Sequence, residues 1–363
     1  MIQANVSDVK QERNYGVEYL RMISMYFIVV LHVLGQGGIL NNLQPLSIKY
    51  DVMYLLEGVV YCAVNCFAII SGYGMSMGKT KYNKLISLWL QVLFYSVVLT
   101  VIVAVFMPGR VTKSDILKAF FPLMSDRYWY FTSYFVLYLC TPILNRVIND
   151  LTKEYYIALL IGMGLLFVFF SPVFGNYRGL CDGYSFGWLI ALYFVGGYIR
   201  KYPINNISPC KALLGYIVCV LGTGGEIAIE YITSMIGNFK SGNRLISYLS
   251  PTVVGASIAL SILFASLKVK PNKRLLRVSS QLSFSVYLIH TNLAVFNNIL
   301  KDAFLKFVGY PVPVLLMIVL VSAGGIFLLC LLLDLLRLRL FELVGIDRFS
   351  LKLSEKITRT FRR

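Results

Sequence analysis

The chain has 363 residues, of which 58% are hydrophobic and only 14% are charged, and its mean hydropathy is +0.71. Soluble domains carry about a quarter charged residues, so this composition excludes a disordered chain, a secreted disulfide scaffold and an ordinary cytosolic enzyme. The 34 Lys and Arg residues outnumber the 17 Asp and Glu residues. Because they lie between apolar runs, they indicate orientation signals and not a nucleic-acid surface. The sequence therefore predicts an all-α, polytopic membrane protein.

Ten apolar segments are candidates for spanning helices, which need about 20 residues each. They lie near residues 17–38, 54–77, 85–107, 128–148, 155–171, 184–199, 212–236, 246–267, 278–298 and 312–334. The fifth and sixth are short. The ninth is the most polar and could instead lie at the membrane interface.

The distribution of basic residues predicts the orientation. With both termini cytoplasmic, the inner segments carry 23 Lys and Arg residues and the outer segments carry 10. An excess on the inner side is the usual pattern in membrane proteins. We expect one integral-membrane domain over residues 1–363, with a cytoplasmic N-terminus at 1–16 and a basic cytoplasmic tail at 344–363. The tail is expected to bind anionic lipid head groups, and no nucleic-acid partner is expected.

The first apolar segment carries ionisable residues, which are costly in a bilayer and therefore candidates for function. Arg21 and His32 are eleven residues apart, so they share one helical face and are separated by roughly 16 Å along the axis. Glu18 precedes Arg21 by three residues and can pair with it. Two structural interpretations remain open: Arg21 could be an interfacial anchor, and His32 could form a bond between helices.

His290 is the second of only two histidines in the chain. It lies 13 residues beyond Arg277, so about 20 Å into the membrane, at a depth similar to that of His32. Imidazole takes and returns protons near neutral pH, and two at one depth suggest a shared cavity. His290 could equally have a structural role and orient a neighbour.

Three glutamates, Glu57, Glu226 and Glu230, also lie in apolar segments. One of them could assist His32, although a structural ion pair is the more common role for such a residue. We expect no metal site, because Cys62 and Cys66 have no histidine or second cysteine pair nearby.

The loop from Lys79 to Lys84 is basic and predicted to be cytoplasmic. A positive-inside signal would explain it. It could also bind the phosphates of a nucleotide-like donor, together with Arg21.

Five segments resemble the integral-membrane acyltransferase 3 family, which includes bacterial glycan O-acetyltransferases. The resemblance covers about Asn14 to Leu343. One departure concerns the loop after Tyr73, where many members carry Arg-x-x-Arg and this chain has Lys81 and Lys84. Lysine keeps the positive charge but cannot form the two parallel hydrogen bonds that an arginine guanidinium can. The segments are Arg21…His32, Val64–Tyr73 with its Ser-Gly-Tyr ending, Tyr128–Asn145, Tyr193–Arg200 and Ser283–His290.

The resemblance implies transfer of an acyl group, expected to be acetyl, from cytosolic acetyl-CoA or another acyl-CoA to a hydroxyl of an extracytoplasmic or lipid-linked glycan. It implies a multi-pass protein of the bacterial inner membrane. His32 and His290 would be catalytic, and Arg21, Lys81 and Lys84 would bind the CoA phosphates. Arg127, Trp129 and Tyr130 could stack on a sugar, or form an interfacial aromatic belt.

Two other classes of function remain open. A transporter or flippase could also contain buried charges and glycine pairs, although the chain shows no matched halves with corresponding broken helices. A non-catalytic scaffold would leave the two central histidines unexplained.

Overall fold

The computed structural model describes residues 13–170, 180–204, 207–237, 245–274 and 278–360, and this described part of the chain is helical without a strand. The α-helices are α1 (Tyr15–Leu34), α2 (Ile48–Val60), α3 (Ala63–Met75), α4 (Tyr82–Phe106), α5 (Lys113–Ala119), α6 (Trp129–Asp150), α7 (Lys153–Met163), α9 (Phe186–Lys201), α10 (Pro209–Met235), α11 (Pro251–Ser266), α13 (Ser283–His290), α14 (Leu293–Val295), α15 (Val312–Val344) and α16 (Ile346–Thr360). Short 3₁₀ or π segments are η1 (Leu40–Asn42), η2 (Gly164–Phe169), η3 (Cys181–Gly183), η4 (Val278–Leu282), η5 (Phe296–Leu300) and η6 (Leu305–Phe307).

Six helical stretches within the described residues are long and apolar enough to cross a membrane. They are α1, the α2–α3 pair, α4, α6, α10 and α15. The other four predicted segments are also helical but are shorter or interrupted: α7 continues into η2, and α9 and α11 have 16 residues each. The protein is a multi-pass, all-helical membrane protein, while ten spans and cytoplasmic termini stay predictions.

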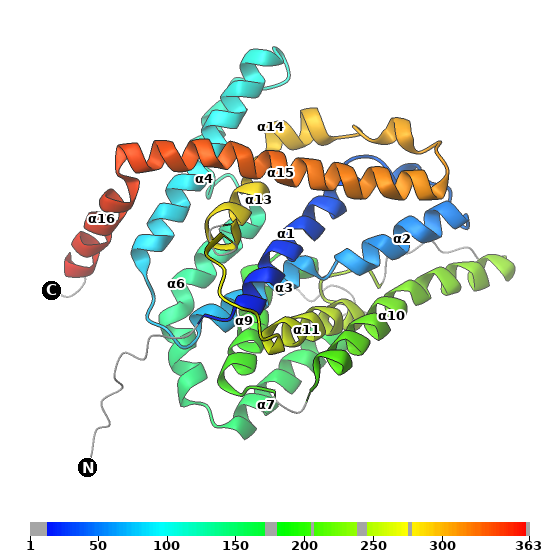
Figure 1. Ribbon diagram of the computed structural model, residues 1–363, viewed down its shortest axis with the longest axis horizontal. Coiled ribbons are helices and arrows are strands. Elements are labelled where there is room, and N and C mark those ends of the chain that lie inside the picture. Colours follow the sequence, from blue (N-terminus) through cyan, green and yellow to red (C-terminus); the bar gives the residue numbers. More distant parts are fainter. Residues whose placement is uncertain (1–12, 171–179, 205–206, 238–244, 275–277, 361–363) are drawn as a thin grey trace.

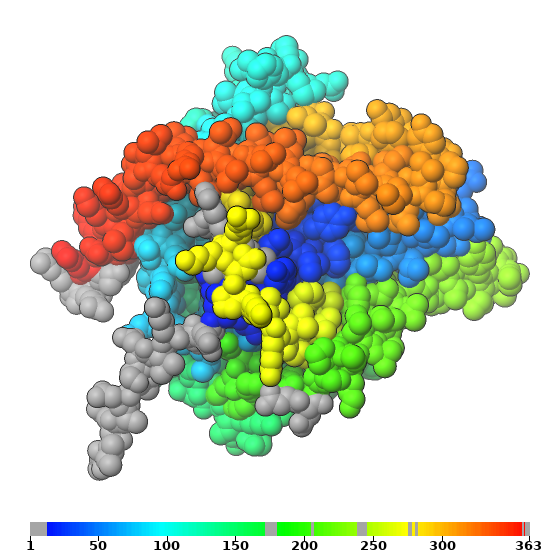
Figure 2. Space-filling view, viewed as in Figure 1, coloured from blue at the N-terminus to red at the C-terminus, as the bar shows by residue number. Residues whose placement is uncertain are grey.

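Helix α1 lies in the middle of the bundle (Figure 1) and contacts α2, α3, α11, α13 and α15. In the space-filling view of one face, only a narrow strip of α1 is visible between its neighbours (Figure 2). The Asn14 side chain caps the helix by accepting a hydrogen bond from the Val17 amide at 3.2 Å. The same side chain donates to the Ala265 carbonyl at 2.7 Å, which ties the start of α1 to the end of α11. The ionisable residues of α1 are thereby placed inside the protein.

Helices α3 and α9 cross with their backbones in close contact. A Cβ atom at Gly72 would lie 2.1 Å from the Tyr193 carbonyl oxygen, and one at Gly196 would lie 1.9 Å from the Ile69 carbonyl oxygen. Both distances are impossible for real atoms, so only glycine permits this crossing. These glycines belong to the Ser-Gly-Tyr and Gly-Gly segments noted in the sequence, which gives those segments a packing role.

The ninth predicted segment, 278–298, is not one continuous helix. It is formed by η4, α13, α14 and η5, with a break at Thr291 and Asn292 directly after His290. The Asn292 side chain caps α14 by accepting from the Ala294 amide at 3.1 Å, and it also donates to the Tyr128 hydroxyl at 2.9 Å. These local bonds compete with the helix, which explains the break that apolar periodicity alone did not predict.

The outer surface is apolar where it would face lipid, as at Leu328 and Leu336 of α15, which are 60% and 70% exposed. The predicted basic tail is largely the helix α16, which turns away from α15 at Gly345 (Figure 1). Helix α16 packs against α4 and is strongly amphipathic. Together α15 and α16 form one band along an edge of the molecule (Figure 2).

Candidate active site

The predicted stripe on α1 faces the protein interior. Met25 and Ile28 lie between Arg21 and His32 on the same helical face, and their side chains are only 2% and 8% exposed. Met25 packs in the core cluster that includes Val286, whereas Ile28 packs in a second core cluster. Arg21 and His32 are therefore two polar ends of a buried apolar stripe, and they are not lipid-facing residues.

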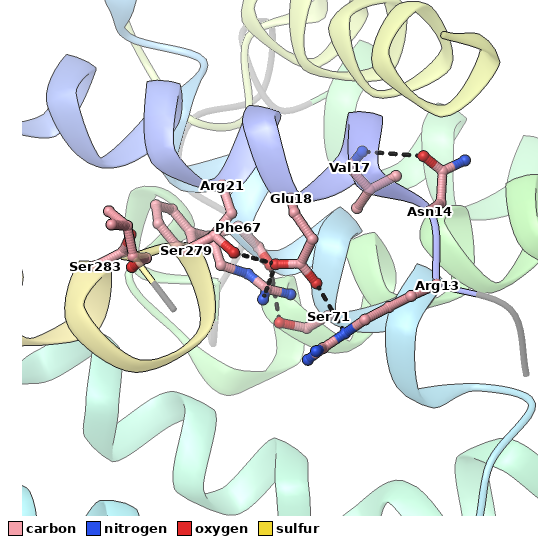
Figure 3. Close-up of polar contacts among 10 residues, drawn as sticks. Arg13, Asn14, Val17, Glu18, Arg21, Phe67, Ser71, Ser279 and Ser283 are labelled. Carbon is pink, nitrogen blue, oxygen red and sulfur yellow. Dashed lines mark hydrogen bonds and ion pairs between the residues drawn. The ribbon is translucent and has the colours of Figure 1, made fainter. Parts of the chain in front are cut away.

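Glu18 organises the polar end of this stripe (Figure 3). Its carboxylate is 5% exposed and accepts from Arg21 Nη1 at 2.8 Å and from the Ser279 hydroxyl at 2.6 Å. Arg13 forms a second ion pair with the same carboxylate at 3.5 Å. The expected Glu18–Arg21 pair is thus present, and it fixes the guanidinium while leaving a quarter of the Arg21 side chain accessible.

The start of α4 adds two cations to this region, Lys81 at the N-cap and Lys84 in the first turn. Lys81 and Lys84 are exposed, and the Lys81 carbonyl accepts from the Tyr138 hydroxyl at 2.9 Å, which anchors the loop to α6. Lys81 precedes Lys84 by three residues, and the charges of Lys81, Arg13 and Arg21 all act on the Lys84 amine. Arg13 and Arg21 pair with the buried Glu18 carboxylate, and with the two lysines the positive charges exceed the one negative charge, which suits phosphate groups. We call Arg13, Glu18, Arg21, Lys81 and Lys84 the basic cluster.

The two histidines are in direct contact. His32 Nδ1 lies 2.8 Å from His290 Nε2, and the ring centroids are 5.0 Å apart. The Phe296 ring covers His32 at 5.1 Å in an edge-on arrangement. His32 is half-buried, whereas His290 is 3% exposed. Two residues 258 positions apart in the chain therefore form one imidazole pair inside the bundle.

The hydrogen bonds of His290 determine the tautomers of the pair. His290 Nδ1 lies 2.5 Å from the Val286 carbonyl oxygen, which can only accept, so Nδ1 carries the proton. In neutral His290 the Nε2 atom is then an acceptor, and the hydrogen of the 2.8 Å bond belongs to His32 Nδ1. His32 Nε2 is left with a free lone pair. The pair thus resembles a base and its orienting group, with His32 as the base.

Side chains donate hydrogen bonds to the backbone carbonyls near the end of α13, where the helix breaks. The last carbonyls of a helix have no partner within it. Here Thr291 donates its hydroxyl to the Tyr287 carbonyl at 2.7 Å, and Tyr128 donates to the Leu288 carbonyl at 3.1 Å. Two of the terminal carbonyls of α13 are thus engaged by side chains, which ties the helix end that carries His290 to its surroundings.

Comparison with known proteins identifies the family. A family model described as an acyltransferase domain matches residues 14–334. The chain belongs to the acyltransferase 3 family. No curated protein and no solved structure matched the chain. The match includes both histidines and every residue of the basic cluster except Arg13, which directly precedes it, so the site described above lies almost entirely within the acyltransferase domain.

The three residues considered for acceptor binding in this acyltransferase do not form one surface. Arg127 is 5% exposed and donates to the Asp115 carbonyl at 2.9 Å and to the Thr100 hydroxyl at 3.1 Å. These bonds hold α5 against α4, which is a structural role. Trp129 and Tyr130 are neighbours on α6 but point to different aromatic groups, since Trp129 packs on Tyr184 at 4.5 Å and Tyr130 packs on Tyr134 and Tyr287 at 6.3 and 6.2 Å.

The buried acids of the acyltransferase have partners other than His32. Glu226 accepts from the Tyr54 hydroxyl at 2.5 Å and from the Leu245 amide at 2.9 Å. Asp334 is fully buried and pairs with Arg337 at 2.6 Å and with the Tyr95 hydroxyl at 2.5 Å. The group that hydrogen-bonds to His32 is His290, so a carboxylate is not its orienting partner. Among the described residues, no group of three or more His, Cys, Asp or Glu side chains could hold a metal ion.

Sequence reasoning missed Arg13 and Ser279 as partners of Glu18, and it missed the Asp334–Arg337 pair. The i to i+3 spacing of Asp334 and Arg337 in an apolar helix could have indicated that pair. Ser279 lies 261 residues from Glu18, and nothing in the sequence connects the two.

Proposed function

We propose that this acyltransferase moves an acetyl group from cytosolic acetyl-CoA to a hydroxyl of an extracytoplasmic or lipid-linked glycan, as a multi-pass protein of a bacterial inner membrane. The observation that supports the proposal best is the stripe on α1. It joins a phosphate-binding type of cluster at Arg21 to a tautomerically fixed base at His32, roughly 16 Å away along the helix. This separation suits an extended pantetheine arm between the CoA phosphates and the thioester.

The basic cluster at one end of the stripe binds the CoA phosphates and takes no part in bond making or breaking. Arg21, held by Glu18, presents its remaining N–H groups to phosphate oxygens, and Lys81 and Lys84 add mobile charge at the exposed rim. Charge-assisted bonds of this kind are stronger than neutral ones. Glu18 raises the cost of displacing Arg21, because moving the guanidinium would leave a buried carboxylate with one partner fewer.

The acceptor end carries the chemistry. His32 Nε2 takes the proton of the acceptor hydroxyl while that oxygen attacks the thioester carbonyl carbon. The new C–O bond forms, the C–S bond breaks, and the proton returns from His32 to the departing CoA sulfur. During the step, His32 Nδ1–H continues to donate to His290 Nε2, which stabilises the imidazolium. In the alternative covalent route, His32 Nε2 attacks the thioester itself and passes the acyl group on. Ping-pong kinetics would identify that route.

The test is an assay in liposomes with acetyl-labelled CoA and a crude glycan-lipid fraction. An acyltransferase labels the acceptor or hydrolyses the thioester, whereas a transporter or flippase does neither. Absence of both reactions in protein that still binds CoA would reject the proposal. Mass spectrometry of cell-envelope glycans from a deletion strain would then identify the acceptor.

We also propose that α16 lies on the inner membrane surface and binds anionic lipids. Ser350 and Ser354 pack against the protein, while Phe349 and Ile357 are 53% and 41% exposed beside the basic residues of the helix. Apolar and basic residues on neighbouring faces are typical of interfacial helices. Hydrogen exchange in nanodiscs should show slower exchange of α16 with anionic lipid than with zwitterionic lipid alone, and equal rates would reject this role.

A further inference from the structure

Four aromatic rings meet at the end of α6 that is remote from the basic cluster. Tyr61 lies 5.0 Å from Tyr248, Trp129 lies 4.5 Å from Tyr184, and Tyr184 lies 5.1 Å from Tyr248, between ring centroids. Trp129 also stacks on Tyr248 at 6.3 Å with an interplanar angle of 28°. We call these four residues the aromatic platform.

The platform and the basic cluster lie at opposite ends of α6. Asn145, near the other end of α6, donates to the Met75 and Gly78 carbonyls beside the basic loop, at 2.9 and 3.0 Å. Trp129 precedes Asn145 by sixteen residues, which is about 24 Å along the helix. With the predicted orientation of the chain, the platform is on the side where an extracytoplasmic acceptor would arrive.

The chain is shaped to hold the platform together. Each ring lies at a helix start or break: Tyr61 between α2 and α3, Trp129 at the start of α6, and Tyr184 and Tyr248 just before α9 and α11. Gly183 has φ +92°, and a Cβ atom at this position would lie 2.5 Å from Tyr248 Cβ. Only glycine therefore allows this segment to pass close to Tyr248. The preceding Asp182 has φ +53°, an unfavourable conformation for a non-glycine residue. Backbone strain of this kind is common at binding sites.

The rings are not simply part of the hydrophobic core. Tyr184 is 46% exposed and Tyr61 and Trp129 are half-buried, whereas Tyr248 is 6% exposed and lies beneath them. An aromatic belt at a membrane interface would present separate rings to lipid. Here four elements bring their rings into contact with one another, and Tyr184 is the most accessible of the four.

Carboxylates border the aromatic platform. Glu57 lies one helical turn before Tyr61, whose amide donates to the Glu57 carbonyl at 2.8 Å, and Asp182 lies two residues before Tyr184. A sugar ring presents C–H groups to an aromatic face and hydroxyl donors to carboxylates. A negatively charged sugar would add a carboxylate beside two acidic side chains, which is unfavourable whether or not both of those are ionised.

The platform also connects to the histidine pair through neighbouring rings. Trp129 contacts Tyr130 at 5.6 Å, and Tyr130 contacts Tyr287 at 6.2 Å. Tyr287 lies three residues before His290 on α13. The platform is thus joined to the helix of the proposed base by a chain of contacting rings.

We infer that the aromatic platform is the acceptor subsite and that it selects an uncharged sugar ring, with Tyr184 and Trp129 stacking on the ring and Glu57 accepting from its hydroxyls. This assignment rests on the proposed function for the role of the sugar as acceptor. It replaces Arg127 and Tyr130 as acceptor-binding residues and keeps Trp129.

Direct binding tests the subsite without any acyl donor. Trp129 is one of three tryptophans, so its fluorescence can report occupation of the platform. Titration of the purified protein with methyl glucoside and N-acetylglucosamine should give a saturable change, at least tenfold weaker for glucuronate. The change should be lost in Trp129→Phe and weakened about tenfold in Tyr184→Ala. Tyr310→Ala is the matched control, because Tyr310 is similarly exposed at 48% but lies outside the platform. No saturable change with either sugar, or a response to choline alone, would overturn the inference.

Steady-state kinetics separate this inference from the proposed function. In protein that transfers acetyl groups, Tyr184→Ala and Glu57→Gln should raise KM for the acceptor about tenfold, equivalent to about 1.4 kcal/mol, and leave CoA binding unchanged. Unchanged acceptor KM in both variants would overturn the subsite while the proposed function stands. Sugar binding without any acetyl transfer or thioester hydrolysis would reject the proposed function and leave the platform as a sugar-binding site.

Discussion

The two ends of α1 are built in opposite ways. Glu18 and Arg21 belong to a charged network in which one carboxylate has three side-chain partners and the guanidinium stays partly accessible. His32, eleven residues further on, has one hydrogen-bond partner among the described residues, His290, and the Phe296 ring packs edge-on against it. A network of charges suits the binding of a charged group, because its cations are held in place and can still form bonds to a bound anion. A neutral pair with one free lone pair suits proton transfer, because little else competes for the proton.

The sharpest way to break this comparison is to remove the proposed base. His32→Gln keeps hydrogen-bonding capacity but cannot take a proton, so acceptor acylation should fall by about 10²–10⁴-fold, the usual contribution of a positioned general base. Isothermal titration should show nearly normal CoA affinity, because the basic cluster is untouched. Turnover close to that of the unmodified protein would make His32 a packing residue and move the search for the base to His290.

Removing the orienting group should have a smaller effect. His290→Ala leaves His32 Nδ1–H without its acceptor, so His32 can rotate or adopt the other tautomer. Groups that orient a functional imidazole typically contribute about 10–100-fold. We expect kcat to fall in this range with acceptor KM little changed, and added imidazole to restore part of the rate. A loss as large as that of His32→Gln, without rescue by imidazole, would show that His290 takes part directly in the chemistry.

The stripe on α1 could be predicted from the sequence because it depends only on helical periodicity. Arg21, His32 and the Glu18–Arg21 pair follow from spacing within one helix. The equal depth of His32 and His290 suggested a shared cavity, but depth says nothing about rotation around each helix axis. The contact between the two rings, and hence the choice of base, required the packed structure.

Other features depended on interactions that one segment cannot reveal. Arg127 stands beside aromatic residues in sequence, which suggested sugar binding, yet its guanidinium points to Asp115 and Thr100. The break after His290 arises from side-chain bonds of Asn292 to α14 and to Tyr128. The aromatic platform unites four separate segments, and only Trp129 had been considered.

At the other end of α1, Arg21 can be tested against a matched neighbour. Arg21→Gln removes a charge-assisted contact to phosphate, for which a loss of about tenfold in CoA affinity is reasonable. Arg13→Gln is the control, since Arg13 binds the same carboxylate but is half-exposed, with a longer ion pair of 3.5 Å. It should change affinity far less. Equal effects of the two variants would mean that CoA affinity depends on the total positive charge around Glu18 and not on the position of Arg21.

The smallest effect is expected for the lysines of the same cluster. Lys81 and Lys84 are exposed and flexible, so each contributes a screened point charge and not a fixed bond. Lys84→Ala should weaken CoA binding by about two- to threefold at low salt, and the difference from the unmodified protein should shrink as salt is added. Titration with CoA and with dephospho-CoA completes a double-mutant cycle. If Lys84 contacts the 3′-phosphate, the substitution has no effect on dephospho-CoA. If Lys84→Ala instead weakens CoA binding as much as Arg21→Gln does, and the loss persists in high salt, the lysine makes a fixed contact, and the contrast between anchored arginine and mobile lysine in this cluster is wrong.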